Sequence, residues 1–172
     1  TFRYVACKPN YYIAPTNKDK HGKELWNHHK MVKRTMFNYD GVEGGKTGYT
    51  TKAGGTLVTF AKRGDQELIV VDLCAHGYEL YEDTIKMLNY GFNNYKTIAP
   101  FKTMNTVLKD DTYGFLKTGN ELSPYKIPLK HLNDVTVMLE KNQSASKLTY
   151  KCKDNKYIIS YDGKQIGSVK LH

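Results

Sequence analysis

The sequence predicts an α+β protein in which an antiparallel sheet with one packed helix is followed by a small all-β domain. Strand-like segments in residues 46–74 precede a single segment of helical period in residues 79–92. Beyond Pro100 the apolar residues alternate with polar ones, which is the period of a strand. The 172 residues suffice for two small domains, and we expect these to be 1–99 and 100–172.

The predicted sheet is a three-stranded antiparallel meander. Its first strand, Lys46 to Thr50, follows a glycine-rich stretch that suits a bend or a close backbone approach. Thr56–Ala61 has strand composition, and the Gly64-Asp65 pair can turn the chain back. The nearly continuous apolar run Leu68–Cys74 is typical of a central strand covered on both faces, and Cys74 is expected in the core.

One amphipathic helix is predicted over Glu79–Tyr90. Apolar residues recur there at helical spacing, at Tyr81, Ile85, Leu88 and Phe92. Gly91 is expected to end the helix as its C′ residue. The helix should pack across the meander, and the second face of the central strand then needs cover from elements upstream.

The strands of the second domain are predicted from alternation and turn signals. Two segments have period two, one through Val135, Val137 and Leu139 and one through Leu148, Tyr150 and Cys152. A further strand, Lys156–Tyr161, precedes Asp162-Gly163, a strong hairpin dipeptide. Near the start of the chain, Tyr11–Ile13 is a short strand candidate.

Composition limits the classes of partner and of site. A formal charge of +9 creates a positive field that attracts nucleic acid, anionic lipid or acidic wall polymers alike. The lysines are spread along the chain instead of forming a block, so we expect no nucleic-acid partner. Three widely spaced cysteines, Cys7, Cys74 and Cys152, argue against a disulfide framework and against a paired CxxC metal site. No apolar run is long enough to span a membrane.

The segment Lys46-Thr47-Gly48 carries the chemistry that the sequence suggests. On a strand, an ammonium and a hydroxyl can hold a terminal carboxylate by charge-assisted hydrogen bonds. Gly48 keeps the strand surface open for a ligand backbone, and the backbone N–H of Tyr49 can stabilise an oxyanion. The tripeptide alone is a weak signal, because Lys117-Thr118-Gly119 repeats it in a turn-rich stretch where no site is expected.

The surroundings of Lys46 resemble one protein family. The segments Gly41–Thr50, Ala53-Gly54, Ala61–Arg63 and Asp83–Phe92 look like the serine-type D-alanyl-D-alanine carboxypeptidases among the low-molecular-mass penicillin-binding proteins. Upstream, Pro15–Asn17 and Asn27–Lys30 also fit that family, and the stretch after Pro100 is similar to its second, all-β domain. The chain thus resembles a C-terminal portion of such a protein, with residues 1–99 as the end of the transpeptidase-like domain and 100–172 as the accessory domain.

This resemblance implies a serine hydrolase of peptidoglycan maturation that removes the terminal D-alanine from stem peptides through an acyl-enzyme. It implies stem peptides ending in D-Ala-D-Ala and β-lactams as partners, and no metal or other cofactor. By the same resemblance, Lys46 and Thr47 bind the substrate carboxylate, Gly48 shapes the strand and the Tyr49 N–H donates to the oxyanion. The family acts in the cell envelope, at the outer face of the cytoplasmic membrane.

The family's nucleophile is expected upstream of the segments found here. In the family it lies on an S-x-x-K helix turn before the Lys-Thr-Gly strand and is assisted by an S-x-N loop. No serine precedes Lys46 in this sequence. Ser123–Lys126 and Ser144–Lys147 match S-x-x-K in letters, but Pro124 opposes a helix and the second match lies in a polar connection between strands. We therefore expect no catalytic residue in this chain, which by itself should be inactive.

Two functions from other classes are also compatible with the sequence. A non-catalytic module that binds the cell wall or a partner through its β domain and positive surface is the main alternative, and a nucleic-acid binder is more distant. An exposed sheet surface is expected to favour self-association. The pair His28-His29 is expected to be solvated or locally bonded instead of binding zinc, and Asp72 to lie at a sheet edge or to be satisfied by local hydrogen bonds.

Overall fold

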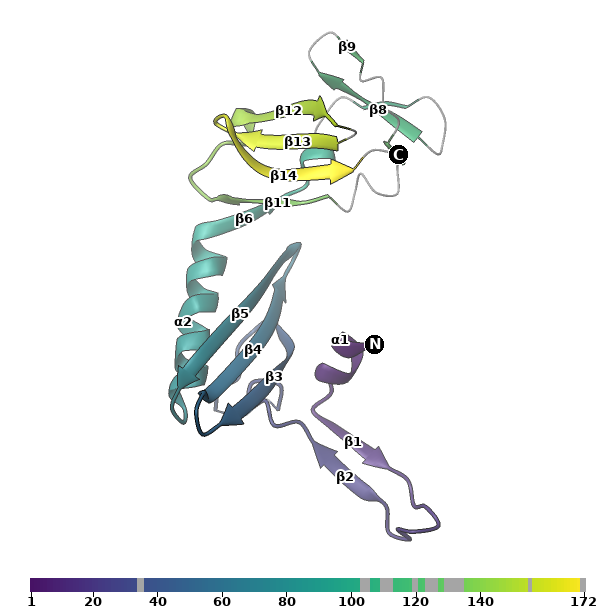
Figure 1. Cartoon of the computed structure of the whole chain (residues 1–172), viewed down its shortest axis with the longest axis vertical. Coiled ribbons are helices and arrows are strands. Elements are labelled where there is room, and N and C mark those ends of the chain that lie inside the picture. The colour runs from purple at the N-terminus through teal and green to yellow at the C-terminus, as the bar shows by residue number, and fades with distance from the viewer. Residues whose placement is uncertain are drawn as a thin grey trace. The chain divides into compact units, whose positions relative to one another are not determined.

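The computed structural model describes residues 1–33, 36–102, 106–108, 113–118, 121–122, 127–128, 135–154 and 156–170. The chain divides into two compact units, Thr1–Asn93 and Asn94–His172. This division comes a few residues before the boundary expected from sequence at 99/100. The reason is that β6 (Tyr95–Ile98) pairs with β11 (Val137–Glu140) and so belongs to the second unit (Figure 1).

The first unit is built on an antiparallel sheet whose described strands have the order β3-β4-β5 (Figure 1). These strands are β3 (Val42–Thr50), β4 (Gly54–Arg63) and β5 (Gln66–Ala75). The chain turns at Gly64, whose φ of 58° favours glycine, to join β4 to β5. The meander predicted from sequence is therefore confirmed, and the protein has the predicted α+β class.

Helix α2 (Glu79–Asn94) covers one face of this sheet. The predicted apolar stripe is confirmed, because Tyr81, Leu88 and Phe92 are buried in one cluster with Leu57 of β4. The prediction that Gly91 ends the helix is wrong, since α2 continues to Asn94. A Cβ at Gly91 would lie 2.6 Å from Cδ1 of Leu68, so this glycine serves close packing of the helix against β5.

Strand β5 departs from its prediction. Among the described strands it lies at the edge of the sheet, and β4 is the central one. The side chains that face away from α2 are exposed: Ile69 by 73%, Val71 by 54% and Leu73 by 66%. Cys74 is also exposed, with a φ of 64°, so its expected place in the core is wrong. The apolar run predicted cover on both faces, but within the described part of the chain only the α2 face of β5 is covered.

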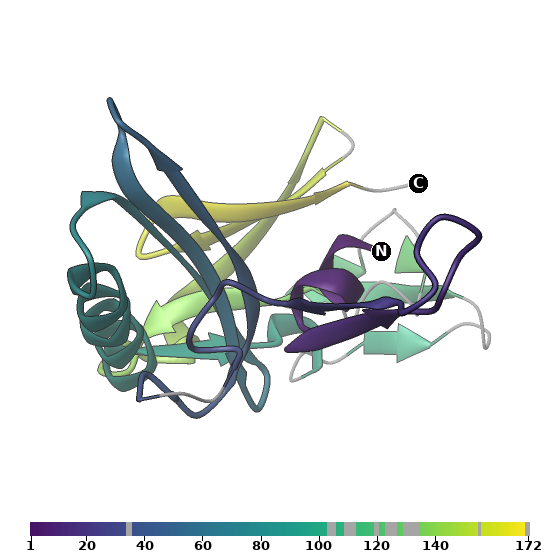
Figure 2. The same ribbon diagram turned by 90° about the horizontal axis from the view of Figure 1, so that it is seen from below.

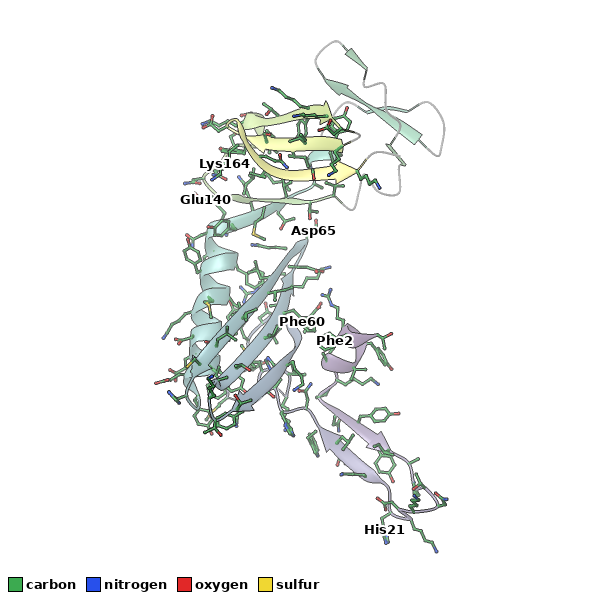
Figure 3. The ribbon with its side chains drawn as sticks, in the orientation of Figure 1. Phe2, His21, Phe60, Asp65, Glu140 and Lys164 are labelled. Atoms are coloured by element: carbon green, nitrogen blue, oxygen red, sulfur yellow. The ribbon has the colours of Figure 1, made fainter. Side chains whose placement is uncertain are left out.

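The N-terminal segment adds a short helix and a hairpin. Helix α1 (Phe2–Ala6) contacts β3, and Arg3 forms ion pairs with Glu43 of β3 and Glu67 of β5 while lying over the Phe60 ring. Figure 3 marks Phe2 on α1 and Phe60 on β4. The strand expected at Tyr11–Ile13 is confirmed as β1 (Asn10–Ile13), which pairs with β2 (Lys23–Trp26). This hairpin projects away from the sheet (Figures 1 and 2).

The second unit is all-β apart from two short 3₁₀ turns in its described residues, η1 (Pro100–Lys102) and η2 (Ala145–Lys147). One sheet has the order β12-β13-β14, and another joins short strands in the order β10-β8-β7, with β9 paired to β8. The bounds of these strands are β7 (Thr106–Leu108), β8 (Tyr113–Thr118), β9 (Glu121–Leu122), β10 (Ile127–Pro128), β12 (Leu148–Lys153), β13 (Lys156–Tyr161) and β14 (Lys164–Lys170).

The alternation predicted for this unit is confirmed. Val137 and Leu139 of β11 are buried together with Leu148, Tyr157 and Ile159 in one cluster. The hairpin between β13 and β14 turns at Asp162-Gly163, where both residues have positive φ, 49° and 80°. Two consecutive residues of positive φ are the requirement of a type I′ turn, which explains why an Asp-Gly pair stands here.

Candidate functional site

Lys46-Thr47-Gly48 lies in the middle of β3, at an edge of the described sheet. Lys46 is paired with Val58, which is itself paired with Val71, so these three side chains share the face opposite α2. Thr47 is opposite Leu57 and lies on the α2 side of the strand, where it is half-buried. The Lys46 ammonium and the Thr47 hydroxyl therefore lie on opposite faces of the sheet, next to the same edge of β3.

The Lys46 ammonium donates a hydrogen bond of 2.6 Å to the carbonyl oxygen of Thr47. The side chain thus folds along the edge of β3. In an antiparallel pair the backbone groups of alternate residues point in the same direction, so the N–H of Tyr49 shares the direction of the Thr47 carbonyl. The Tyr49 side chain is 76% exposed. An ammonium, a backbone donor and a backbone acceptor are consequently available along one strand edge.

Close contacts explain the glycines around Lys46. A Cβ at Gly48 would lie 2.5 Å from Oγ1 of Thr56, the residue opposite it on β4. A Cβ at Gly45 would lie 2.7 Å from the His29 ring and would collide with the carbonyl oxygen of Val58. The backbone of β3 is therefore packed tightly on both sides of Lys46.

His29 is a buried polar residue behind this strand. The sequence predicts a solvated or locally bonded pair for His28-His29. The structure separates the two, because His28 is exposed while His29 is fully buried and bonded to Thr59 of β4, with 2.9 Å between Nε2 and Oγ1. Burial lowers the pKa of His29 to about 4, so its ring is neutral at neutral pH. Its burial depends on tertiary packing, which the local sequence does not reveal.

A groove of about 620 Å³ lies beside Lys46. Its lining comes from α1, from the β1–β2 hairpin and from Gly45 and Lys46 themselves. Its wall includes four aromatic side chains that are each more than half exposed: Phe2, Tyr4, Tyr11 and Trp26. The groove therefore offers an apolar, aromatic surface next to a lysine.

Other candidates from the sequence do not form an active site in the described residues. Ser144 caps η2 by accepting from the Ser146 N–H, and the Lys147 ammonium lies 3.6 Å from a carboxylate oxygen of Asp162. Lys147 is thus held by a carboxylate instead of by Ser144, in the polar connection that the sequence predicts. Lys117 and Thr118 lie in β8, whereas Gly119 and Ser123–Lys126 fall outside the described residues. The first unit, Thr1–Asn93, contains no serine.

In the described part of the chain, the other titratable groups with shifted pKa values give no sign of a nucleophile or a metal centre. Burial raises the pKa of the Cys7 thiol, the opposite of what an activated cysteine requires. Asp72 lies on the edge strand β5, as expected, and its pKa is raised by burial and then by the nearby Asp83 carboxylate. Within the described residues, no three histidine, cysteine, aspartate or glutamate side chains converge as metal ligands would. The described helices include none that is long and apolar enough to cross a membrane.

Known proteins similar to this chain are carboxypeptidases by name. The chain is 29% identical over 154 residues to D-alanyl-D-alanine carboxypeptidase DacF of Bacillus subtilis, a match that covers 87% of this chain and 37% of that protein. It is 35% identical over 77 residues to D-alanyl-D-alanine carboxypeptidase DacC of Escherichia coli, which covers 44% of this chain and 18% of that protein. The chain therefore spans well under half the length of these relatives. No family model matches the sequence.

Solved structures share the fold. Penicillin-binding protein 5 of Haemophilus influenzae matches 99% of this chain and 49% of its own length, with a TM-score of 0.60 and 22% identity. Penicillin-binding protein 6B of Escherichia coli also matches 99% of this chain, with 44% of its own length covered, a TM-score of 0.53 and 19% identity. The resemblance inferred from sequence is confirmed: the homologues and structural neighbours of this chain are D-alanyl-D-alanine carboxypeptidases and penicillin-binding proteins, and the partial coverage fits a C-terminal portion of them.

Proposed function

We propose that this chain forms the carboxylate-binding side of the active site in a serine-type D-alanyl-D-alanine carboxypeptidase. The observation that carries the proposal is the exposed Lys46 ammonium on an edge of the described sheet, within a Lys-Thr-Gly segment. The names of the relatives give the same activity. The substrate is then a peptidoglycan stem peptide ending in D-Ala-D-Ala, and β-lactams bind as its mimics.

In this proposal each residue of the segment has one role. Lys46 and Thr47 bind the terminal carboxylate, and a charge-assisted hydrogen bond of this kind contributes about 1.5–3 kcal/mol. Lys46 leaves the Thr47 carbonyl when the ligand carboxylate arrives. Gly48 lets the ligand backbone lie against the strand, and the Tyr49 N–H stabilises the oxyanion that forms when a serine attacks the substrate carbonyl. The reaction proceeds through an acyl-enzyme and needs no metal or other cofactor.

The isolated chain is inactive in this account, because the first unit contains no serine. The nucleophile comes from residues that precede this segment in the parent protein. Residues Thr1–Asn93 are the end of the transpeptidase-like domain, and Asn94–His172 are the accessory all-β domain. The parent protein acts in the cell envelope, at the outer face of the cytoplasmic membrane.

The carboxylate site can be tested on this chain alone. Titration with acetyl-D-Ala-D-Ala should shift the backbone amide resonances of Lys46–Tyr49, and Lys46→Ala should remove the effect. The methyl ester of the same dipeptide lacks the carboxylate and should shift them much less. Equal shifts with the ester, or none at β3 with the free acid, would reject Lys46 as the carboxylate ligand.

Self-association is a second part of the proposal. Ile69, Val71 and Leu73 leave an apolar stripe exposed on β5, at an edge of the described sheet. Exposed apolar edge strands favour pairing with another chain.

We expect no nucleic-acid partner, since the lysines form no block.

A non-catalytic module that binds the cell wall or a partner is the alternative function. The aromatic groove beside Lys46, in a unit without serine, is the observation that favours it. Binding of this chain to purified peptidoglycan sacculi distinguishes the two. Binding that survives Lys46→Ala but is lost with Trp26→Ala supports the module, whereas binding that follows Lys46 supports the carboxylate site.

A further inference from the structure

His29 lies directly behind the part of β3 that carries Lys46. Its side chain is 0% exposed and sits in the layer between the sheet and α2. Its Nε2 is 2.9 Å from Oγ1 of Thr59, and Thr59 is the residue directly opposite Gly45 in the β3–β4 pairing. Because Gly45 precedes Lys46, the imidazole contacts β3 at the residue next to the lysine that is proposed to bind the carboxylate.

The contact between the His29 ring and Gly45 leaves no space for a side chain at position 45. A Cβ at position 45 would lie 2.7 Å from both Cδ2 and Nε2 of the imidazole. The ring therefore occupies the space that a side chain on β3 would fill. A strand that rests on a buried ring cannot move toward the helix layer, so the ring limits where the β3 backbone places Lys46.

His29 is itself held from two further directions. Its backbone N–H donates to Oδ1 of Asn27 at 2.9 Å, and the Asn27 amide donates to the carbonyl oxygens of Ala6 and Lys8. On the other side, the ring meets the Tyr81 ring of α2 edge-on, with 6.0 Å between centroids and 79° between planes. The imidazole thus joins α2 and the segment that lines the aromatic groove to the strand of Lys46.

The groups around the imidazole come from three elements of the first unit. They are the Thr59 hydroxyl and the Val58 carbonyl from β4, the Gly45 backbone from β3 and the Tyr81 ring from α2. Tyr81 is the only titratable group in this set. The Nδ1 atom is buried and has no hydrogen-bond partner within the described residues. Burial lowers the pKa of the ring to about 4 and outweighs the backbone hydrogen bonds of Val58 and His29, which raise it, so a charge appears here only under acidic conditions.

We propose that His29 is a positioning residue for Lys46: its imidazole, packed on Gly45 and bonded to Thr59, fixes the place and orientation of the β3 backbone at the carboxylate site. His29 does not contact the ligand in this account. The proposal rests on the proposed function only for the identity of the ligand that Lys46 binds. The positioning of the β3 backbone by His29 follows from the packing alone.

The chain offers a matched control for the test. His28 is the exposed neighbour of His29, so His28→Gln changes the same residue type one position away without entering the core. His29→Gln keeps a neutral polar group that can bond to Thr59, whereas His29→Leu removes the bond and keeps an apolar side chain. The backbone amides of β13 in the second unit report whether a variant disturbs the whole chain.

Hydrogen exchange and amide chemical shifts measure the position of β3 without activity. His29→Leu should speed exchange of the Gly45–Tyr49 amides about tenfold or more relative to β13, as expected for loss of a local support. His29→Gln should restore most of the protection, and His28→Gln should have no effect. In the unmodified chain, the Gly45 and Lys46 amide shifts should titrate together with the His29 ring near pH 4, and His29→Gln should abolish this. Unchanged β3 amides in His29→Leu, or no titration linked to the ring, would overturn the proposal.

Titration with acetyl-D-Ala-D-Ala separates this proposal from the proposed function. If the dipeptide shifts the Lys46–Tyr49 amides, His29→Leu should weaken binding about tenfold, which corresponds to about 1.4 kcal/mol. If His29→Leu fails to fold, His29→Gln and the acid titration of the unmodified chain decide the outcome. A dipeptide that never binds rejects Lys46 as the ligand, while the amide measurements still decide whether His29 positions β3.

Discussion

Nζ of Lys46 lies 2.6 Å from the carbonyl oxygen of Thr47, so the proposed ligand for a carboxylate is bonded to its own strand when no ligand is present. A backbone carbonyl is a weaker partner for an ammonium than a carboxylate is. In the proposed site, a ligand carboxylate would therefore replace the Thr47 carbonyl as the acceptor for Lys46. The bond also keeps the ammonium at the strand edge before the ligand arrives.

Lys46→Ala should slow acylation by a labelled penicillin about 10- to 100-fold in a protein that includes this segment and the nucleophile. The reason is the loss of one charge-assisted hydrogen bond to the ligand carboxylate, about 1.5–3 kcal/mol. The measurement is the rate of covalent labelling. Lys52→Ala, at an exposed lysine after the same strand, is the control and should leave the rate unchanged. An unaltered rate in Lys46→Ala would contradict the assigned role.

Gly45→Ala should destabilise the first unit by about 1–3 kcal/mol, the usual cost of overpacking. The added methyl meets the buried His29 ring at 2.7 Å and the Val58 carbonyl, and neither group can move aside easily. The free energy of unfolding from urea titration measures the effect.

Gly91→Ala is the matched comparison for that substitution. The atoms nearest to its methyl all belong to the flexible Leu68 side chain, with Cδ1 at 2.6 Å, and a rotamer change can relieve this contact. Alanine also favours the helix interior by about 1 kcal/mol over glycine. The free energy of unfolding should therefore change by no more than about 1 kcal/mol. A loss equal to that of Gly45→Ala would show that β3 is packed no more tightly at Gly45 than α2 is at Gly91.

The stability of the first unit should fall as the pH is lowered from 6.5 toward 4. The pKa of His29 is lowered from 6.5 to about 4, so the unfolded chain binds more protons than the folded chain in this window. This shift in the pKa of His29 corresponds to about 3 kcal/mol in the free energy of unfolding. The first unit has this stability in full above pH 6.5 and has lost it below pH 4.

Urea titrations at several pH values measure this slope. His29→Gln should flatten it, since glutamine does not titrate, and His28→Gln should retain it. A slope that persists in His29→Gln would assign the acid sensitivity to other groups.

Val71→Lys should reduce self-association of this chain. Val71 is 54% exposed on β5, so the lysine costs little folding stability while it opposes strand pairing at the edge. Sedimentation velocity at several concentrations measures the effect. Met87→Lys adds the same charge on the exposed side of α2 and should leave association unchanged. A concentration-independent monomer mass for the unmodified chain would remove the basis of this prediction.

Local patterns predicted the elements of this fold well. The three strands of the meander, the apolar stripe of α2 and the Asp162-Gly163 turn all follow from spacing and turn chemistry that neighbouring residues determine. Predictions that depended on tertiary packing were less successful. Gly91 marks a close approach to Leu68 instead of a helix end, and the apolar run Leu68–Cys74 forms an edge strand among the described residues.

The candidate site was predictable only in part. The sequence placed Lys46 on a strand next to Thr56–Ala61, and the structure agrees. No local pattern predicts that His29 lies under Gly45, because its contacts with Thr59 of β4 and Tyr81 of α2 depend on tertiary packing. The segment Asn27–Lys30 resembles the family but does not by itself predict this contact.

The central claim is that Lys46-Thr47-Gly48 is the carboxylate-binding part of a site whose serine is supplied by preceding residues. The most direct test is the intact mass of this chain before and after incubation with excess penicillin, beside a longer protein that includes those residues, with peptide mapping of any adduct. We expect no adduct on this chain and one penicilloyl group on a serine upstream of Lys46 in the longer protein. An adduct on Ser123, Ser144 or Ser146 of this chain would contradict it, because the chain would then contain a working nucleophile.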